Sequence, residues 1–285
     1  MKRRAFLRTV AGVAGMAAAA GLRETAAPWL GSVESKASAD EHDAAEAKTT
    51  RIVLIGHQPD HPPGTHLYLD ECRLLADCLK QTPGVEAVVS DGWPQDAALL
   101  DGVSALVLYS SPGAEILLKG GNRETVDKLL ESGVGLTALH WATGIGDHND
   151  QALVEKYLNA MGGIFGFGWS GLDVSQSRVE PADSQHPICR GWTSYALHEE
   201  WYLDLRFLPG AQPIAKARVK DRNQVVAWAY ERPGARPGRS YGNTLGHFHE
   251  NFLIEPFRKA IVNGILWTTH REIPAAGAPC AIAGS

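Results

Sequence analysis

Short apolar segments alternate with helical patterns through residues 51–161, and this alternation most constrains the fold. Residues 51–56, Arg-Ile-Val-Leu-Ile-Gly, form the continuous apolar run that is typical of a strand buried on both faces. Further strands are expected at residues 85–89, 105–109 and 135–139, with helices at about 67–80, 124–130 and 151–161. Strands that alternate with helices indicate a mostly parallel, doubly wound α/β sheet with helices on both faces.

The second half of the chain is richer in strands. They are expected at residues 200–207, 213–219, 225–230 and 239–245, and a last helix at about 256–267 begins with a proline in its first turn. No internal repeat and no Pro/Ser-rich linker divides this region. We therefore expect one domain over residues 51–274, preceded by a polar linker at 40–50 and followed by a C-terminal tail at 275–285.

The N-terminus has the pattern of an export signal. An arginine pair, Arg3-Arg4, precedes Phe6-Leu7 and a weakly apolar Ala/Gly-rich run, and Ala37-Ser38-Ala39 offers a cleavage site. Residues 1–39 are thus expected to be a twin-arginine signal peptide of a periplasmic or exported protein. A membrane anchor is the alternative, but the run is short and weakly hydrophobic for a span of about 20 residues.

Charge and cysteine content exclude several classes of partner and site. Removal of residues 1–39 takes six basic and two acidic residues from the 27 and 32 of the whole chain, which leaves a net charge of -9. An acidic protein without a basic stripe is a poor ligand for nucleic acid or anionic membranes. The four cysteines lack zinc-site spacing, and Cys72 and Cys78 would lie about 9 Å apart on one helix, so we expect at most one disulfide.

Histidines gather in four short segments. Seven of the eleven histidines lie within residues 57–66, 139–143, 198–202 and 246–249. The first, second and fourth segments follow expected strands, and the third opens one. Because ligands of open α/β sheets bind beyond the carboxyl ends of the strands, these segments can converge on one pocket. A single histidine in such a loop is more often an ordinary polar residue than a functional one. The prediction of a site therefore rests on the four segments together.

The residue types in these segments suit proton transfer or metal binding. Imidazole and carboxylate groups bind borderline metals and move protons near neutral pH. His247 and His249 alternate with Phe248, so on a strand they would share a face. The turn after residue 139 has the strand–turn–helix layout of a nucleophile elbow, yet His140 stands at the bend instead of Ser or Cys. Covalent acyl chemistry is therefore not expected there, and the absence of His-Glu-x-x-His gives no indication of a zincin-type peptidase.

Several short motifs in the right order resemble the ThuA-like (trehalose utilisation) family. They span residues 51–274 and comprise His61-Pro62-Pro63-Gly64-Thr65-His66, the elbow from Gly135 to His140, Glu199-Glu200-Trp201-Tyr202, Val226-Ala227-Trp228, Gly246-His247-Phe248-His249 and Asn263-Gly264-Ile265-Leu266-Trp267. Three positions depart from the family pattern. Glu199 replaces the usual Asp, Leu67 stands where subgroup members often have Glu, and Trp141 is bulkier than usual.

The resemblance implies a class I glutamine amidotransferase-like fold, a flavodoxin-like three-layer sandwich with six or seven strands. It also implies a role in carbohydrate metabolism, on trehalose-like or 3-keto-glycoside substrates. Glutamine amidotransferase activity is not expected, because the elbow cysteine of that class is absent.

These considerations lead to one hypothesis for the site. The catalytic candidates are His140, Glu199, Glu200 and His247. A divalent metal such as zinc is one expected cofactor, with His140, His247 and His249 as its ligands, while no nucleotide cofactor is indicated. The expected substrate-binding residues are His61, His66, Trp141, Tyr202 and Arg206, with Tyr202 and Trp141 stacking on a sugar face.

Two other functions fit the sequence. The first is a non-catalytic sugar-binding protein on the same scaffold, which would bind saturably and release no product. The second is a docking partner of another exported protein, which would present a large apolar patch away from the histidines. A homo-oligomer is compatible with either, and the expected partner is a small sugar or glycoside.

Overall fold

The computed structural model describes residues 49–282, and these contain one large mixed sheet of nine strands in the order β2-β1-β3-β4-β12-β11-β10-β7-β8. The first five strands in this order pair in parallel, and the remaining four pair antiparallel. The parallel part consists of β1 (Thr50–Gly56), β2 (Val85–Asp91), β3 (Val103–Tyr109), β4 (Gly135–Leu139) and β12 (Gly238–Asn243).

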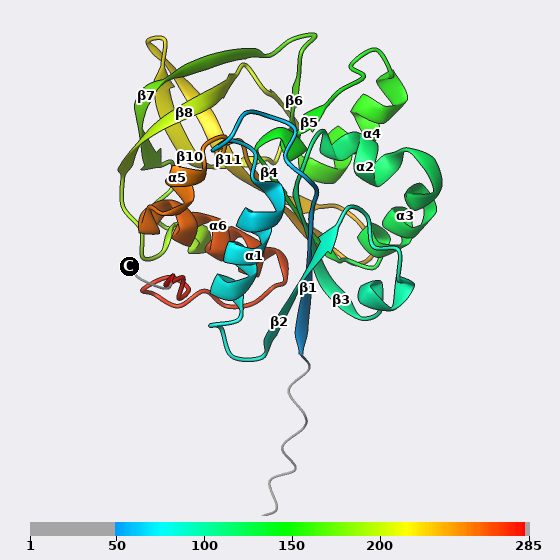
Figure 1. Cartoon of the computed structure of the whole chain (residues 1–285). Helices are drawn as coiled ribbons and strands as arrows, with labels where there is room; N and C mark the ends of the chain where they lie inside the picture. Colours follow the sequence, from blue (N-terminus) through cyan, green and yellow to red (C-terminus); the bar gives the residue numbers. More distant parts are fainter. Residues whose placement is uncertain (1–48, 283–285) are drawn as a thin grey trace, which may run out of the picture. The chain divides into compact units, whose positions relative to one another are not determined.

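Helices cover both faces of the parallel part, as the apolar runs predict. On β1, Ile52 and Leu54 face one core, whereas Val53 and Ile55 face the other, because successive side chains of a strand alternate. The first core is covered by α1 (Tyr68–Leu79) and α6 (Glu255–Thr268). The second is covered by α2 (Gly113–Leu118), α3 (Arg123–Glu131) and α4 (Gln151–Met161). Figure 1 shows these two groups of helices on opposite sides of β1 and β3.

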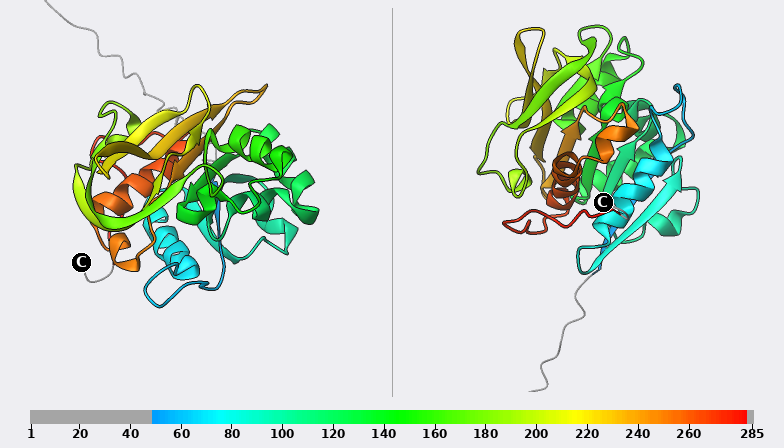
Figure 2. Two further views of the ribbon diagram at one scale, coloured as in Figure 1. Left: turned by 90° about the horizontal axis from the view of Figure 1, so that it is seen from above. Right: turned by 60° about the vertical axis from the view of Figure 1, so that its left-hand side comes forward.

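The antiparallel part extends the sheet and curls over its edge (Figure 2). It consists of β11 (Arg222–Arg232), β10 (Gln212–Val219), β7 (Gly171–Pro181) and β8 (Tyr195–Leu203). A second, three-stranded sheet is formed by β5 (Gly144–Ile145), β6 (Gly163–Gly166) and β9 (Arg206–Phe207). The remaining short helices are η1 (Ala97–Leu100), η2 (Gly120–Asn122), η3 (His140–Thr143), η4 (Pro187–Cys189) and α5 (His249–Phe252).

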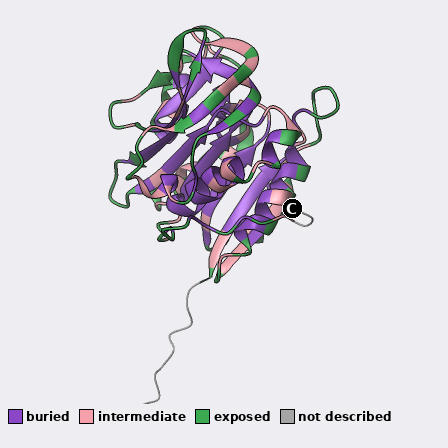
Figure 3. Cartoon of the chain, turned by 90° about the vertical axis from the view of Figure 1, so that its left-hand side faces the viewer, coloured by how far each residue is buried: buried purple, intermediate pink, exposed green. Residues whose placement is uncertain are grey.

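The predicted fold class is confirmed, while several boundaries differ. The sheet has nine strands over the described residues instead of the six or seven that the resemblance implies. The strand expected at residues 200–207 is split into β8 and β9, because Asp204 has a left-handed φ of 55° that ends the extended backbone. The elements α2, β6 and β7 have no counterpart among those expected from the sequence. Figure 3 shows the central strands buried and the outer strands partly exposed.

The ends of the domain lie beyond the expected boundaries. Thr50, expected in the linker, already belongs to β1 and pairs with Val85. The expected signal peptide and most of the linker lie outside the described residues. Residues 275–282, expected as a tail, pack on the domain: Ala278 N–H donates to Asn263, and Ala281 exchanges hydrogen bonds with Gln81. All four cysteines are buried and free, in line with the expectation of at most one bridge.

Across residues 49–282, no helix combines the length and the apolarity that crossing a membrane requires.

Candidate functional site

His140 occupies the bend that follows β4. Leu139 is paired with Asn243 at the ends of two neighbouring parallel strands, so His140 and Thr244 leave the sheet side by side. His140 is fully buried and has a left-handed φ of 51°, which a non-glycine residue adopts only under constraint. Its Nδ1–H donates to the Thr244 carbonyl at 2.8 Å. The elbow geometry predicted from the sequence is therefore present, with an imidazole at its tip.

Two loops bring His66 and His247 to the same point. Thr65 and Phe248 form an isolated antiparallel bridge, and His66 N–H donates to the His247 carbonyl at 3.1 Å. The loop after β1 and the loop after β12 are thus joined through their backbones. His66 also has a left-handed φ, 49°, and its side chain is 1% exposed. These contacts fix both imidazoles beside His140, although 181 residues separate them in sequence.

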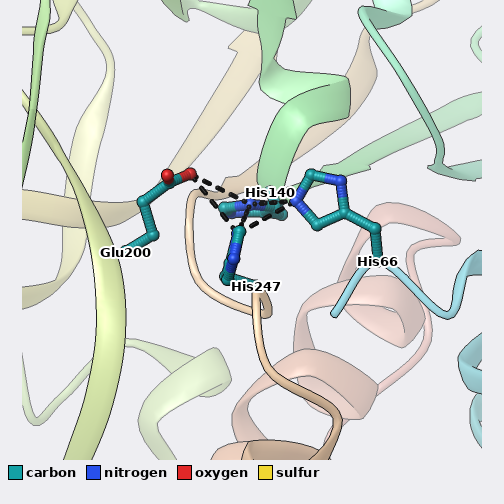
Figure 4. Close-up of side chains that lie close together, drawn as sticks. All are labelled: His66, His140, Glu200 and His247. Atoms are coloured by element: carbon teal, nitrogen blue, oxygen red, sulfur yellow. Dashed lines mark hydrogen bonds and ion pairs between the residues drawn. The ribbon is translucent and has the colours of Figure 1, made fainter. Parts of the chain in front are cut away.

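Glu200 and Tyr202 reach the site from the opposite side, on the edge strand β8. Because β8 alternates, Glu200 and Tyr202 share one face, and Glu199 and Trp201 share the other. Glu200 Oε2 lies 3.6 Å from His140 Nε2 and 3.4 Å from His247 Nδ1. Figure 4 shows the carboxylate pointing toward the three imidazoles.

The four ligand-type groups are spaced as a metal ion would require. The potential ligand atoms of His66, His140, Glu200 and His247 all lie within 4.8 Å of one another. His66 Nε2 is 3.0 Å from both His140 Nε2 and His247 Nδ1, and the latter two atoms are 3.3 Å apart. A tetrahedral ion with metal–nitrogen bonds of about 2.0–2.1 Å spaces its ligand atoms about 3.3 Å apart. The group is therefore close enough to hold a metal.

The hydrogen-bond partners of two imidazoles leave lone pairs at the centre. The Thr244 carbonyl only accepts, so His140 carries its proton on Nδ1 and has a lone pair on Nε2. His66 Nδ1 lies 3.1 Å from the Asp60 carboxylate and 2.7 Å from the Tyr68 hydroxyl, which itself donates to Asp60, so His66 carries its proton on Nδ1 and has its lone pair on Nε2. The Tyr202 hydroxyl lies 3.3 Å from His140 Nε2 and can donate to that lone pair only while no cation occupies it. Two unprotonated nitrogens thus face each other at 3.0 Å, an arrangement that a shared cation stabilises.

The ionisation of these groups agrees with this assignment. Burial lowers the pKa of His66 to about 4, and it holds the pKa of His140 well below its ordinary value, so both are neutral at pH 7. Burial acts to raise the pKa of Asp60, but hydrogen bonds from His61, His66 and Tyr68 outweigh it and lower that pKa. Asp60 is therefore ionised and can accept the Nδ1 proton of His66.

Glu199 stabilises the backbone next to the site through hydrogen bonds. Its buried carboxylate accepts hydrogen bonds from the backbone N–H groups of Glu200, Gly246 and His247 and from the Asn251 side chain, at 2.8–3.0 Å. Burial raises the pKa of Glu199 to about 7, against these four hydrogen bonds, which act to lower it. Glu199 therefore orients the loop that carries His247, and its side chain is on the face of β8 away from the imidazoles.

His249 is not brought into the group of four. His247 and His249 do not share a face of a strand, because β12 ends at Asn243 and His249 begins the helix α5. Its Nδ1 contacts the buried Glu71 carboxylate on α1. His66, expected from the sequence to bind substrate, takes the place expected for His249. His66 has a left-handed φ, which turns its ring toward His140. In the sequence, only the Pro-Gly turn just before His66 hints at this conformation.

The other expected substrate residues are dispersed around the site. Tyr202 is fully buried, with its ring packed against Phe165 and His140, so it does not offer a face to a sugar. Trp141 is partly exposed next to Phe167. The His61 ring packs at a tilt against His66, with a centroid distance of 3.7 Å, and is 40% exposed. Arg206 is exposed and lies over the Trp169 ring, 3.6 Å from its centroid.

The described residues also form a sizeable hollow at some distance from the four ligand-type side chains. It has a volume of about 550 Å³ and is lined by the ends of α2 and α3, by α4 and by residues 230–236. These segments are at the edge where the parallel strands begin, opposite to His140. The hollow contains none of the four ligand-type residues, so the convergence of imidazoles, not volume, identifies the candidate site.

Three solved structures illustrate what this chain is similar to. The chain is similar to the crystal structure of a ThuA-like protein from Bacteroides uniformis, with a TM-score of 0.58 and 15% identity over 84% of this chain and 98% of that chain. It is less similar to a glutamine amidotransferase from Thermotoga maritima, with a TM-score of 0.43 and 10% identity over 78% of this chain and 96% of that chain. The glutaminase domain of Trypanosoma brucei CTPS, with bound acivicin, gives a TM-score of 0.42 and 10% identity over 81% and 98%.

Sequence comparisons extend this result. No curated protein sequence matches the chain significantly. The sequence pattern of the ThuA family, described as trehalose utilisation, matches residues 12–268, which is most of the chain. The chain therefore belongs to the ThuA family, and its function is related to trehalose utilisation.

Proposed function

We propose that this protein is a metal-dependent enzyme that acts on a trehalose-like or 3-keto-glycoside sugar. The observation that carries the proposal is the convergence of three imidazole nitrogens, from His66, His140 and His247, beside the Glu200 carboxylate. Neutral imidazoles with converging lone pairs are the preferred ligands of zinc and related divalent ions. Family membership supplies the link to carbohydrates.

The three imidazoles and Glu200 have different places in this proposal. The nitrogens lie 3.0–3.3 Å apart, and Glu200 is slightly further away, at 3.4–3.6 Å. We therefore assign the three imidazoles as ligands and Glu200 as the proton acceptor beside them. When bound, a divalent ion would polarise a substrate oxygen as a Lewis acid.

The exposure of the side chains indicates where substrate would enter. His140 is 0% exposed and His66 1%, whereas Glu200 and His247 are 17% and 12% exposed. Substrate would therefore approach over Glu200 and His247. Glu200 would take a proton from substrate at its carboxylate, and the Nδ1–H hydrogen bond to the Thr244 carbonyl would keep the His140 ring oriented.

Metal content of the purified protein tests the centre directly. We expect about one divalent ion per chain by elemental analysis, and its loss in His140→Ala and in His247→Ala. His198→Ala is the matched control, because His198 is exposed on β8 and lies outside the group of four. If the protein binds no divalent ion after incubation with zinc, manganese or iron(II), the proposed metal centre is wrong.

Turnover separates an enzyme from the sugar-binding alternative. The metal-loaded and the chelator-treated protein would each be incubated with trehalose and with 3-keto-trehalose, and products followed by chromatography. We expect product only with the loaded protein, and none with Glu200→Gln. Saturable binding with no product from either sugar would favour the binding protein.

We further propose that the protein acts in the periplasm after twin-arginine export. The arginine pair and the Ala-x-Ala sequence at residues 37–39 support this location. Cell fractionation with N-terminal sequencing checks it: we expect a mature chain that begins near residue 40, and export that is lost in Arg3→Lys/Arg4→Lys.

A further inference from the structure

A guanidinium that is buried without an acidic partner lines the hollow beside α4. Arg232, the last residue of β11, is 7% exposed, and its side chain belongs to the wall of the hollow. Gly238 on β12 is its partner in the register, and a Cβ built there would lie 2.0 Å from Arg232 Nη2. Because Gly238 has no side chain, the guanidinium can lie across β12 and reach the start of β4.

The hydrogen-bond partners of this guanidinium are neutral oxygens. Nη1 donates to the Arg239 carbonyl at 3.0 Å and to Ser240 Oγ at 2.6 Å, and Nη2 donates to the Val134 carbonyl. A guanidinium has five N–H donors, so these three hydrogen bonds leave two donors, on Nε and Nη2, for another acceptor. In the described part of the chain no carboxylate forms an ion pair with Arg232, and the neighbouring Glu231 is bonded to Arg239 instead.

Arg232 keeps its charge at neutral pH. Burial lowers its pKa to about 10, so the guanidinium is still protonated at pH 7. A buried cation is costly unless an anion pairs with it and accepts its hydrogen bonds. Arg232 therefore has both the charge and the remaining donors that an anionic ligand requires.

Much of the remaining wall of the hollow is apolar. It includes the buried side chains of Leu118, Ala160 and Tyr230, and Leu130 is partly buried beside them. The volume of about 550 Å³ lies within the range of roughly 300–1,000 Å³ that is usual for small-molecule sites. A ligand that fills this space would bury an apolar body next to Arg232.

The other charged groups of the hollow leave one positive charge in excess. They are Lys156, Arg236 and Glu131. Lys156 Nζ is already paired with Asp127 Oδ2 at 2.5 Å. Arg236, in the hairpin between β11 and β12, and Glu131, at the end of α3, are both exposed. The lining thus has three cations, counting Arg232, against Glu131 and the Asp127 that pairs with Lys156, which favours a ligand with a single negative charge.

We propose that this hollow binds a small amphipathic carboxylate, with the carboxylate on Arg232 and the apolar body against Leu118 and Tyr230. Carboxylates accept strong, charge-assisted hydrogen bonds from guanidinium N–H groups. Arg236 lies at the exposed side of the hollow and adds a second attraction for the anion. The hollow is at the edge of the sheet opposite to His140, so this inference goes beyond the proposed function and does not depend on it.

Matched probes test the charge and the apolar body separately. Octanoate, octanamide and acetate would each be titrated by calorimetry into the purified, chelator-treated protein, because carboxylates also bind metal ions. We expect octanoate to bind at least about tenfold tighter than either of the others, since octanamide lacks the charge and acetate lacks the apolar body. Arg232→Met should remove the preference for octanoate over octanamide.

Two variants at exposed positions decide the test even if Arg232→Met does not fold. Arg236→Ala should weaken the binding of octanoate and leave that of octanamide unchanged, whereas Glu131→Gln should tighten the binding of octanoate because it removes a like charge. The control is Arg178→Ala, which removes an exposed arginine of β7 outside the hollow. The site is overturned if octanoate binds the wild-type protein no tighter than octanamide or acetate. It is also overturned if both Arg236→Ala and Glu131→Gln leave the affinity for octanoate unchanged.

Discussion

At the scale of single residues, His66 and His249 distinguish the ligand set of the structure from the set expected from sequence. His66 Nε2 faces two other imidazole nitrogens at 3.0 Å, whereas His249 Nδ1 is engaged by Glu71. We expect His66→Ala to lose the bound ion and His249→Ala to keep it. Equilibrium dialysis with zinc, followed by elemental analysis of both variants, checks this. The opposite result would identify His249, instead of His66, as a ligand of the ion.

Glu199 gives a second residue-scale prediction. Its carboxylate accepts four hydrogen bonds from N–H groups around His247, and Glu199→Gln would place an amide NH₂ against some of those donors. We expect a loss of about 1–3 kcal/mol in the free energy of unfolding, as for buried polar groups that lose a partner, and weaker zinc binding. Urea denaturation and zinc titration measure the two effects. Glu180→Gln makes the same change at an exposed position of β7 and serves as the control. Unchanged zinc affinity would show that the His247 loop keeps its place without the carboxylate.

The lowered pKa of His66 predicts how the metal-free protein responds to acid. In the folded chain the pKa is about 4, and in the unfolded chain it is near 6.5. The unfolded state therefore binds more protons between these values, so stability falls as pH drops from 6.5 to 4 and is fully retained above 6.5. The shift corresponds to about 3 kcal/mol at most. Urea midpoints of the chelator-treated protein from pH 7 to pH 4.5 should decrease, and the slope should be shallower in His66→Gln. An identical slope in the variant would contradict the assignment.

At the scale of elements, the packing of α6 on β12 depends on one glycine. A Cβ built at Gly264 would lie 2.3 Å from the buried Tyr241 ring. Gly264→Ala gains about 1 kcal/mol of helix propensity, but overpacking of a core costs typically about 1–3 kcal/mol. We therefore expect net destabilisation, measured as a lower urea midpoint. Gly121→Ala is the control, because a Cβ there meets nothing within 4 Å. A more stable Gly264→Ala would mean that Tyr241 moves aside freely.

The parallel half of the fold could be predicted closely from sequence. Residues 135–139 and 151–161 coincide with β4 and α4. These elements are buried on one or both faces, so the spacing of their apolar residues predicts the type of element and its bounds. In contrast, β7 carries polar and charged side chains at most positions and is only partly covered, with Val179 its only buried residue. This segment forms a strand because it pairs with β8 and β10, and no pattern within its own residues predicts that pairing.

The candidate site could be predicted in part for the same reason. The sequence predicts His140, His247 and Glu200 as site residues because they fall at the ends of elements or in a recognisable motif. Which of two neighbouring glutamates faces the imidazoles depends on the register of β8, and a shift of one residue would exchange Glu199 and Glu200. The inward turn of His66 depends on the bridge between Thr65 and Phe248, a contact between opposite ends of the domain.

At the scale of the whole molecule, the centre joins three parts of the chain that are distant in sequence. His66 follows β1, His140 follows β4, and His247 follows β12, so an ion held by all three would link the first, middle and last thirds of the described chain. The unfolded chain has no such arrangement, so the free energy of metal binding adds to the free energy of folding.

Metal binding should therefore raise the stability of the whole domain. At free zinc 100 times above its Kd, linkage gives about 2.7 kcal/mol, which for a domain of this size raises Tm by about 5–10 °C. We expect this shift in calorimetric scans of zinc-loaded against chelator-treated protein, and no shift in His140→Ala. His198→Ala should respond like the wild type, since His198 is outside the group. Because β1, β4 and β12 belong to one sheet, the loaded protein should unfold in a single transition. A shift in only part of a split transition would mean that the ion stabilises the loops without the sheet beneath them.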